Sequence, residues 1–248
     1  MLYRSLPILK RAIPSLVRLL YGKRRPGGWT LSKRDRLQWL LSAHNHVDRR
    51  YLEPDSHEAA QLDYLCALLD KTPPALFLDV GANFGLYAVR IAARYGCRVW
   101  AFEPDRRNFA QLNANLLLNR LLDFVVPVPV AVSSQSRQLA LIAAGDDSTG
   151  QTRTSPEKVG EGSTVAAVAI DEFPLLDFVP NTTFAAKIDV EGAEPDVIVG
   201  MRNLLSQCRG VLQIEVMAVN RERIAAQMAE LGYRQVGRIE EDWYFSNL

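Results

Sequence analysis

The stretch FLDVGANFGLYA, residues Phe77–Ala88, decides the fold class of this chain. An apolar run that includes one acid, Asp79, leads directly into a turn with Gly81 and Gly85, and helix-forming residues follow. A turn of this kind, between a strand and a helix, lies at the carboxyl edge of a doubly wound α/β sheet, where ligands bind. Glycines leave the backbone bare there, so a bulky polar ligand can approach it closely. The sequence therefore predicts a ligand-binding turn after the first strand of the sheet.

Downstream of this turn the chain alternates between strand-like and helix-like stretches. Runs rich in β-branched and aromatic residues predict seven strands, at about residues 75–80, 98–102, 124–130, 184–190, 211–217, 233–238 and 242–246. Helix-like stretches separate most of them, at about residues 84–95, 105–119, 194–207 and 219–231. Such alternation predicts an α/β fold, a three-layer sandwich with helices on both faces of a mostly parallel sheet. The last two strands are joined only by residues 239–242, too few for a crossover helix, so the last strand should be antiparallel.

Two regions interrupt this rhythm. Ser32 is a suitable N-cap for a helix that runs to about Val47, and a second helix fits from about Asp55 to Asp70. Residues 1–72 are therefore expected to form a helical part that covers the site, and residues 73–248 to form the main domain. Residues 133–170 are rich in Ser, Thr, Gly and Gln, and we expect an exposed, partly extended insertion there.

The first 25 residues have a basic amphipathic pattern. At about 100° per residue, one helix face is apolar and the opposite face is basic. The apolar face holds Leu2, Leu6, Leu9, Ile13, Leu16, Val17 and Leu20, and the basic face holds Arg4, Arg11 and Arg18. Pro7 and Pro14 interrupt a continuous helix, and no apolar run reaches the roughly 20 residues of a membrane span. Two interpretations stay open: peripheral contact with an anionic membrane surface, and packing on the protein's own body.

The charge of the chain is unevenly distributed. Its 248 residues include 29 Lys and Arg and 28 Asp and Glu, but residues 1–34 hold nine of the basic residues and no acid. The remainder, with 20 basic against 28 acidic side chains, is not the surface of a nucleic-acid-binding protein. Three cysteines without a CxxC pair predict reduced thiols in a cytoplasmic protein. The histidines of the HNH sequence, His44 and His46, are interpreted as surface residues and not as metal ligands.

Acidic residues next to the glycine turn indicate which cofactor it holds. The spacing GANFG lacks the GxGxxG pattern of a dinucleotide site, and Asp79 would repel a pyrophosphate but suits a cationic ligand. Glu103 closes the next strand, where a carboxylate can accept hydrogen bonds from both hydroxyls of a ribose. Together these features predict S-adenosylmethionine (SAM). The structural alternatives are that Asp79 caps the following helix and that Glu103 is an ordinary acid at a strand end.

The sequence KIDVEGAE holds a second polar cluster. Lys187, Asp189 and Glu191 alternate along one predicted strand, so their side chains should point the same way, at the carboxyl end of the sheet. Asp189 or Glu191 is a candidate general base for a hydroxyl acceptor, with Lys187 holding a carboxylate or lowering the pKa of the acceptor. Alternatively, Asp189, Glu191 and Glu215 bind a divalent cation. The structural alternative is an ion pair between Lys187 and Asp189 that stitches the sheet.

Three motifs together resemble the FkbM-type family of SAM-dependent methyltransferases. They are FLDVGANFGLYA, AFEPDRRNFAQLNANLLLN and AAKIDVEGAEPDVIVGM. The resemblance implies a class I methyltransferase (Rossmann-like) fold with a seven-stranded sheet, and methyl transfer to a hydroxyl oxygen, commonly of a sugar. By position it implies SAM-binding roles for Asp79, Gly81, Ala82, Asn83, Gly85, Glu103 and Pro104. An acid that is frequent after the third strand is missing here, so the adenine contact falls to Ser133 or Ser134, and Met217 stands where a histidine is frequent.

From these features we expect a cytoplasmic, SAM-dependent O-methyltransferase that acts on a saccharide-containing acceptor: a glycan, a glycolipid or a glycosylated metabolite. Contact of residues 1–25 with the inner face of the membrane would favour a membrane-anchored glycan. Two alternatives belong to other classes. A nicotinamide-dependent oxidoreductase is disfavoured by the glycine spacing, and a non-catalytic SAM-fold interaction protein is disfavoured because Asp79, Glu103, Asp189 and Glu191 are all present.

Overall fold

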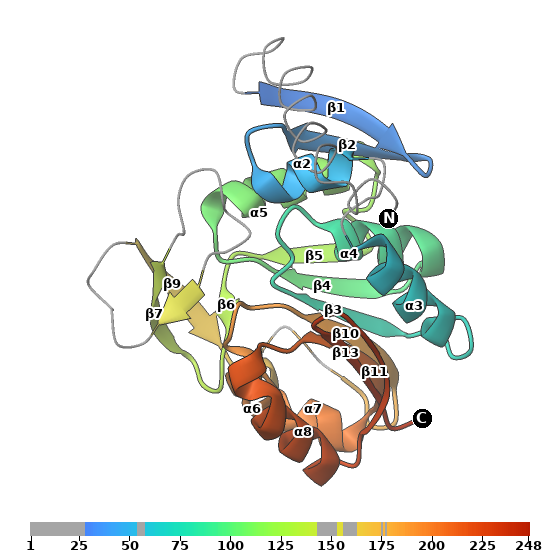
Figure 1. Ribbon diagram of the computed structural model, residues 1–248, viewed down its shortest axis with the longest axis vertical. Helices are drawn as coiled ribbons and strands as arrows, with labels where there is room; N and C mark the ends of the chain where they lie inside the picture. Colours follow the sequence, from blue (N-terminus) through green and yellow to red (C-terminus); the bar gives the residue numbers. More distant parts are fainter. Residues whose placement is uncertain (1–27, 54–57, 143–152, 156–162, 175, 177) are drawn as a thin grey trace.

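The computed structural model describes residues 28–53, 58–142, 153–155, 163–174, 176 and 178–248. Its central sheet has seven strands in the order β12-β13-β11-β10-β3-β4-β5 (Figure 1). Their bounds are β3 Leu76–Val80, β4 Arg98–Phe102, β5 Val125–Val128, β10 Thr183–Ile188, β11 Arg209–Glu215, β12 Arg234–Ile239 and β13 Asp242–Ser246. All neighbours pair parallel except β13, which is antiparallel to both β11 and β12. The predicted fold class, including the antiparallel last strand, is confirmed.

Helices cover both faces of this sheet and form the outer layers. One face packs against α3 (Ala59–Leu69), α4 (Leu86–Tyr95) and α5 (Arg106–Leu118), and the other against α6 (Glu194–Gly200), α7 (Arg202–Gln207) and α8 (Arg221–Glu230). Alternate residues of β3 enter the two cores: Phe77 joins the first, and Leu78 and Val80 join the second. This is the side-chain alternation that a strand buried on both faces requires. The predicted helix over 194–207 is present but divided at Met201.

Part of the predicted insertion forms a second, smaller sheet. Its strands lie in the order β6-β9-β7-β8. Their bounds are β6 Ala131–Val132, β7 Arg137–Ile142, β8 Arg153–Ser155 and β9 Ser163–Val168. Leu139 and Ala167 are buried in a small core of this sheet, so the segment is extended but not wholly exposed. Figure 1 shows it beside the carboxyl end of β5, next to the turns that bear the site.

The helix predicted from Ser32 to Val47 is wrong. Residues there form a hairpin of β1 (Trp29–Arg34) and β2 (Leu37–Ser42), followed by a short helix α2 (His46–Leu52), and Ser32 pairs with Trp39 instead of capping a helix. The physical reason is that burial along β2 alternates with a period of two, as in a strand. Trp39 and Leu41 are fully buried, while Gln38, next to Trp39, is exposed. The two turn residues, 35 and 36, both have positive φ, as tight hairpin turns require. The second predicted helix corresponds to α3.

Two asparagines of α5 hold the hairpin on the domain. Asn115 Oδ1 accepts the backbone N–H of Leu40 at 2.7 Å, and its Nδ2 donates to the carbonyl of Phe84 at 2.8 Å. One turn further on, Asn119 accepts from the N–H of Gln38 and donates to its carbonyl. The two amides lie four residues apart on one helix face. They hydrogen-bond to backbone groups at the edge of β2, as a neighbouring strand would. Because Phe84 belongs to the glycine turn, the same contact joins the hairpin to the turn.

No helix in the part of the chain that the structure describes has the length and apolar character needed to cross a membrane. The amphipathic segment 1–25 lies outside the described residues, so both interpretations of it stay predictions.

Replacing Asn115 by Ala should lower the free energy of unfolding by about 2–4 kcal/mol. The reason is that the buried N–H of Leu40 and carbonyl of Phe84 lose their partner, and each such group costs about 1–3 kcal/mol when unsatisfied. Chemical denaturation monitored by tryptophan fluorescence measures the effect. Asn113→Ala is the matched control, since Asn113 bonds only to the carbonyl of Phe109 in its own helix, and it should cost less than about 1 kcal/mol. Equal effects of the two substitutions would contradict the bridging role of Asn115.

Candidate active site

The glycine turn packs directly on the end of a neighbouring strand. Gly81 has φ +83°, and a Cβ atom there would lie 1.8 Å from the carbonyl oxygen of Asp189, just past β10. Gly85 has φ +92°, and a Cβ atom there would lie 2.6 Å from Leu112 Cδ1 of α5. Both positions therefore exclude any side chain. The protein's own packing accounts for these two glycines, and the turn they make lies against the carboxyl ends of β3, β4 and β10.

Asp79 lies at the end of β3, beneath this turn. It is 1% exposed, and its Oδ2 accepts the N–H of Ala88 at 2.8 Å, so the helix-capping alternative holds for one of its oxygens. Its Oδ1 is buried without a hydrogen-bond partner. Burial raises the pKa of Asp79 to about 6, although the nearby charge of Lys187 opposes that rise. At neutral pH the buried carboxylate remains mostly ionised and attracts a cation.

Glu103 lies just past the end of β4 and is also buried. One of its oxygens accepts the N–H of Asn83 at 2.7 Å, and the other accepts the N–H of Asp105 at 2.8 Å. Burial raises the pKa of Glu103 to about 7, while these two donors favour the ionised form. The carboxylate is thus fixed in orientation and keeps lone pairs for further donors.

A cleft opens where these strand ends meet, and we call it the cofactor cleft. It is lined by Gly81, Asn83, Phe102, Glu103, Pro104, Asn108, Val130, Ala131, Val132, Thr154, Asp189, Val190 and Glu191. Polar groups on the β3 side and apolar groups near β6 suit a ligand with one polar end and one flat apolar end.

The predicted cofactor residues do not all reach this cleft. Of the described residues, Gly81, Asn83, Glu103 and Pro104 line it, and Ala82 lines the neighbouring cavity. Asp79 and Gly85 lie behind the turn and line neither. Ser133 also lines neither: it is 3% exposed, and its Oγ accepts from Arg137 at 3.1 Å. Sequence reasoning missed Asn108 and Thr154, the latter on β8 of the small sheet.

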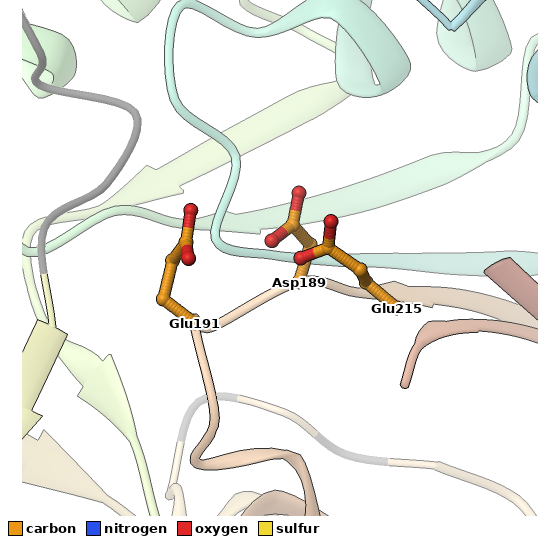
Figure 2. A group of neighbouring side chains, drawn as sticks. All are labelled: Asp189, Glu191 and Glu215. Atoms are coloured by element: carbon orange, nitrogen blue, oxygen red, sulfur yellow. The ribbon is translucent and has the colours of Figure 1, made fainter. Parts of the chain in front are cut away.

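Three acids gather at the carboxyl edge next to the turn (Figure 2). Asp189 and Glu191 follow β10, and Glu215 ends β11. One carboxylate oxygen from each lies within 4.8 Å of the others, and this is the group of metal-type ligands found among the described residues. The predicted alternation along one strand is wrong, because β10 ends at Ile188 and Glu191 has a positive φ of 54°. The acids meet instead because adjacent parallel strands end at the same edge.

The charge of this cluster is balanced by one buried lysine. Lys187 Nζ lies 2.7 Å from Asp189 Oδ2, and 5.0 Å from the ring centroid of Tyr87 on α4. Burial alone would lower the pKa of Lys187, but the carboxylates of Asp189, Glu58 and Asp79 raise it above its usual value. The lysine therefore remains charged, and the ion pair that was one alternative is present.

Glu215 behaves differently from its neighbour. The negative charge of Asp189, followed by burial and a hydrogen bond to Asp189, raises the pKa of Glu215 well above its usual value. Like charges at this distance cannot both be ionised cheaply. The raised pKa favours the protonated form of Glu215, which hydrogen-bonds to Asp189, and Asp189 also pairs with Lys187.

A cavity of about 250 Å³ lies over these groups, and we call it the acceptor cavity. It is lined by His46, Val47, Arg50, Glu58, Gly81, Ala82, Asn83, Phe84, Leu86, Tyr87, Lys187, Asp189, Glu191 and Glu215. Four of these residues, Gly81, Asn83, Asp189 and Glu191, also line the cofactor cleft, so the two spaces adjoin. His46 was expected on the surface. It is exposed, but it also lines the acceptor cavity, as does Arg50 one helical turn further along α2.

The residues present fit SAM. Asn83 lines the cofactor cleft, and its buried Oδ1 has no hydrogen-bond partner among the described residues, so the ammonium group of SAM can donate to it. The buried carboxylate of Asp79, behind the turn, adds negative charge that favours a cationic ligand. Glu103, fixed by two backbone donors, suits the hydroxyls of a ribose. A pyrophosphate would meet the carboxylates of Asp79, Asp189 and Glu191 instead.

Comparisons with known proteins agree with this fit. Residues 79–235, more than half of the chain, match the Methyltransferase FkbM domain. The chain is 31% identical to the hexuronic acid methyltransferase AglP of Haloferax volcanii over 141 residues, which are 56% of this chain and 55% of AglP. The match thus spans about half the length of that relative.

Solved structures share the fold at low sequence identity. The methyltransferase domain of METTL16 superposes with a TM-score of 0.50 at 12% identity, covering 96% of this chain and 80% of that domain. TYW2 of M. jannaschii, solved in complex with AdoMet, gives a TM-score of 0.46 at 12% identity over 89% and 84% of the two chains. At this identity the likeness to METTL16 concerns the fold alone. The match to the domain decides the family: the chain belongs to the FkbM family of methyltransferases, whose cofactor is SAM.

Proposed function

We propose that this protein transfers a methyl group from SAM to a hydroxyl oxygen of a saccharide-containing acceptor. The observation that carries the proposal is the position of Asp189, which lines both the cofactor cleft and the acceptor cavity. A carboxylate at that boundary lies next to the place where a methyl donor and a hydroxyl acceptor must meet. The match to a hexuronic acid methyltransferase supports a sugar acceptor. In this proposal residues 73–248 form the methyltransferase domain, and the described residues before it, 28–53 and 58–72, cover its acceptor side.

The cofactor cleft assigns the proposed binding roles. Glu103 accepts hydrogen bonds from the ribose, and Asn83 with the backbone of Gly81 and Ala82 holds the amino-acid end. Asp79 does not contact SAM in this proposal, but its negative charge behind the turn attracts the positively charged cofactor. Phe102, Pro104, Val130 and Val132 offer apolar surface for the adenine, and they replace Ser133 as the expected contact. When bound, SAM would supply a methyl group on a sulfonium centre. Transfer of the methyl group leaves the sulfur as a neutral thioether, S-adenosylhomocysteine.

The acid cluster assigns the proposed catalytic role to Asp189. Its carboxylate accepts the proton of the acceptor hydroxyl as the oxygen attacks. Lys187, 2.7 Å away, fixes the orientation of that carboxylate, and the carboxyl group of Glu215 hydrogen-bonds to it. Tight positioning matters because an in-line displacement depends on alignment of the reacting atoms. Glu191 lines the boundary of the two spaces and is proposed to accept a second hydroxyl of the sugar.

An acceptor screen tests the function directly. The purified protein is incubated with SAM labelled at the methyl group and with methyl glycosides of neutral hexoses and hexuronic acids, and transfer is followed by formation of S-adenosylhomocysteine. We expect release that depends on a saccharide, and NMR of the product to locate a new O-methyl group. Transfer only to proteins, RNA or amines would overturn the proposed acceptor class while leaving the family assignment intact.

Ribose binding by Glu103 should depend on pH. Because its pKa is raised to about 7, the carboxyl loses one acceptor as the pH falls through 7, and binding should weaken below that value. For 5′-deoxy-5′-methylthioadenosine, which keeps the ribose but has no amino-acid end to titrate, Kd should rise about tenfold between pH 8 and pH 6. Isothermal titration measures this. Glu103→Gln should bind more weakly at pH 8 and show a flat profile, and an unchanged slope in that variant would remove Glu103 from the ribose site.

Replacing Asp189 by Asn should lower kcat by about 10²–10⁴-fold, the usual contribution of a general base. Its Kd for SAM should change less than about threefold, since Asn keeps the size of the side chain. Asp196→Asn on α6 is the matched control: its carboxylate is 41% exposed and pairs with Arg223, so kcat should be unchanged. A loss of SAM binding equal to the loss of kcat would place Asp189 in cofactor binding instead of proton transfer.

Removal of metal distinguishes two hypotheses: that Asp189 is a general base, and that Asp189, Glu191 and Glu215 bind a divalent cation. With Asp189 as base, activity should survive dialysis against EDTA, and added Mg²⁺ should change it less than about twofold. Activity that EDTA abolishes and Mg²⁺ restores would assign the three carboxylates to a cation that orients the sugar hydroxyls.

A further inference from the structure

A second polar cavity, of about 270 Å³, lies between the hairpin, α2, α3 and α4. We call it the hairpin cavity. It is lined by Arg34, Asp35, Tyr51, Glu58, Ala59, Leu62, Asp63, Leu86 and Arg90. Its volume is far larger than a single water needs. None of these residues takes part in the roles proposed above.

Tyr51 of α2 has a buried hydroxyl with no hydrogen-bond partner among the described residues. The side chain is 4% exposed, and its ring packs edge-on against Trp39 at a centroid distance of 5.2 Å. The ring is therefore fixed by the core, but the phenolic oxygen has no hydrogen-bond partner. Leaving such a group unsatisfied is unfavourable. Since Tyr51 lines the hairpin cavity, a ligand there can supply the missing hydrogen bond.

Charged groups of the same cavity surround this hydroxyl. Burial raises the pKa of Tyr51 to about 12, and the charges of Arg90, Arg34 and Asp35 also act on its oxygen. Arg34 donates to the backbone carbonyl of Tyr51 at 2.7 Å and lies over its ring. Arg90 forms an ion pair with Asp35 across the cavity. Tyr51 thus borders a polar space whose walls are held in place by their own contacts.

The chemistry of the walls favours a neutral polyhydroxyl ligand over an ion. Two guanidinium groups stand against the three carboxylates of Asp35, Glu58 and Asp63, so neither sign dominates. Hydroxyl groups donate to carboxylates and accept from guanidinium groups, so they match such a mixed lining. Leu62 and Leu86 add apolar surface for the C–H face of a sugar ring.

The hairpin cavity adjoins the acceptor cavity. Glu58 and Leu86 line both spaces, so a ligand that passes between them extends from Asp189 to Tyr51. A chain of linked sugar units has this form, with one unit over the acid cluster and the next beside the hairpin.

We propose that the hairpin cavity is a second saccharide subsite, which binds the sugar unit next to the one that is methylated and hydrogen-bonds it through Tyr51 and Asp63. The acceptor is then at least a disaccharide. This inference rests on the proposed saccharide acceptor, but it can fail while that function stands.

Binding of matched sugars tests the subsite. Ligand-observed NMR and isothermal titration, with S-adenosylhomocysteine present, compare methyl β-glucuronoside and methyl β-glucoside with disaccharides in which each carries one further glucose or N-acetylglucosamine unit. We expect the best disaccharide to bind at least about tenfold more tightly than its monosaccharide. Tyr51→Phe should reduce this advantage about three- to tenfold, as loss of one hydrogen bond does, and leave monosaccharide and SAM binding unchanged.

The variants separate a ligand contact from a structural role. Tyr51→Phe keeps the packed ring and removes an unsatisfied hydroxyl, so its Tm should be equal to or above that of the parent. Asp63→Asn, at an exposed position on α3, should reduce the disaccharide advantage in the same way. Tyr95→Phe is the control: its hydroxyl bonds to Asp70 and to the carbonyl of Cys66, outside the cavity, so it should lower Tm without changing the advantage.

Three results would overturn the subsite. If monosaccharides and disaccharides bind or are methylated equally well, the saccharide function stands and the hairpin cavity is not a subsite. If the disaccharide advantage exists but is the same in Tyr51→Phe and Asp63→Asn as in the parent, the second unit binds elsewhere. If no saccharide binds at all, the proposed function fails, and the subsite fails with it.

Discussion

The site depends on one backbone contact, between the turn at Gly81 and the carbonyl of Asp189. The N–H of Asp189 donates to the carbonyl of Val80 at 3.0 Å, and a Cβ atom on Gly81 would overlap the oxygen of Asp189. This approach closes the space between the ends of β3 and β10. It also forces the chain after Asp189 to leave the sheet, which places Glu191 in a left-handed conformation and turns its carboxylate toward Glu215. Cofactor turn and acid cluster are therefore one structural unit.

Burial gives the charges in this unit their properties. Asp79, Glu103 and Lys187 are all at least 95% buried, and isolated charges in such places would be neutralised. Lys187 keeps its charge because three carboxylates surround it, and Glu103 is oriented by two backbone donors. Asp79 retains an oxygen with no partner. The buried negative charge of Asp79 beneath the turn favours a cationic ligand in the adjoining cleft.

The sequence predicted the sheet and its ligand edge because strand period and turn chemistry are local properties. It also placed Asp79, Glu103 and Asp189 at strand ends correctly. It failed where tertiary contacts decide. The helix predicted there overlooked the strand-like alternation that buries Trp39 and Leu41, and the asparagines of α5, remote in sequence, hold the resulting hairpin on the domain. Tyr51 and Arg50 became site residues through that docking, and no local pattern marks a hydroxyl or guanidinium that will face a cavity.

The docking of the hairpin also couples the two halves of the site. Asn115 binds Leu40 of the hairpin and Phe84 of the glycine turn with the same amide, and Phe84 follows Asn83, which lines both the cofactor cleft and the acceptor cavity. A shift of the hairpin must therefore move either this amide or the turn. Since Tyr51 packs on both Trp39 of the hairpin and Phe84 of the turn, occupation of the hairpin cavity would restrain the same elements that hold the cofactor. The hairpin and the glycine turn therefore hold each other in place through Tyr51, Phe84 and the amide of Asn115.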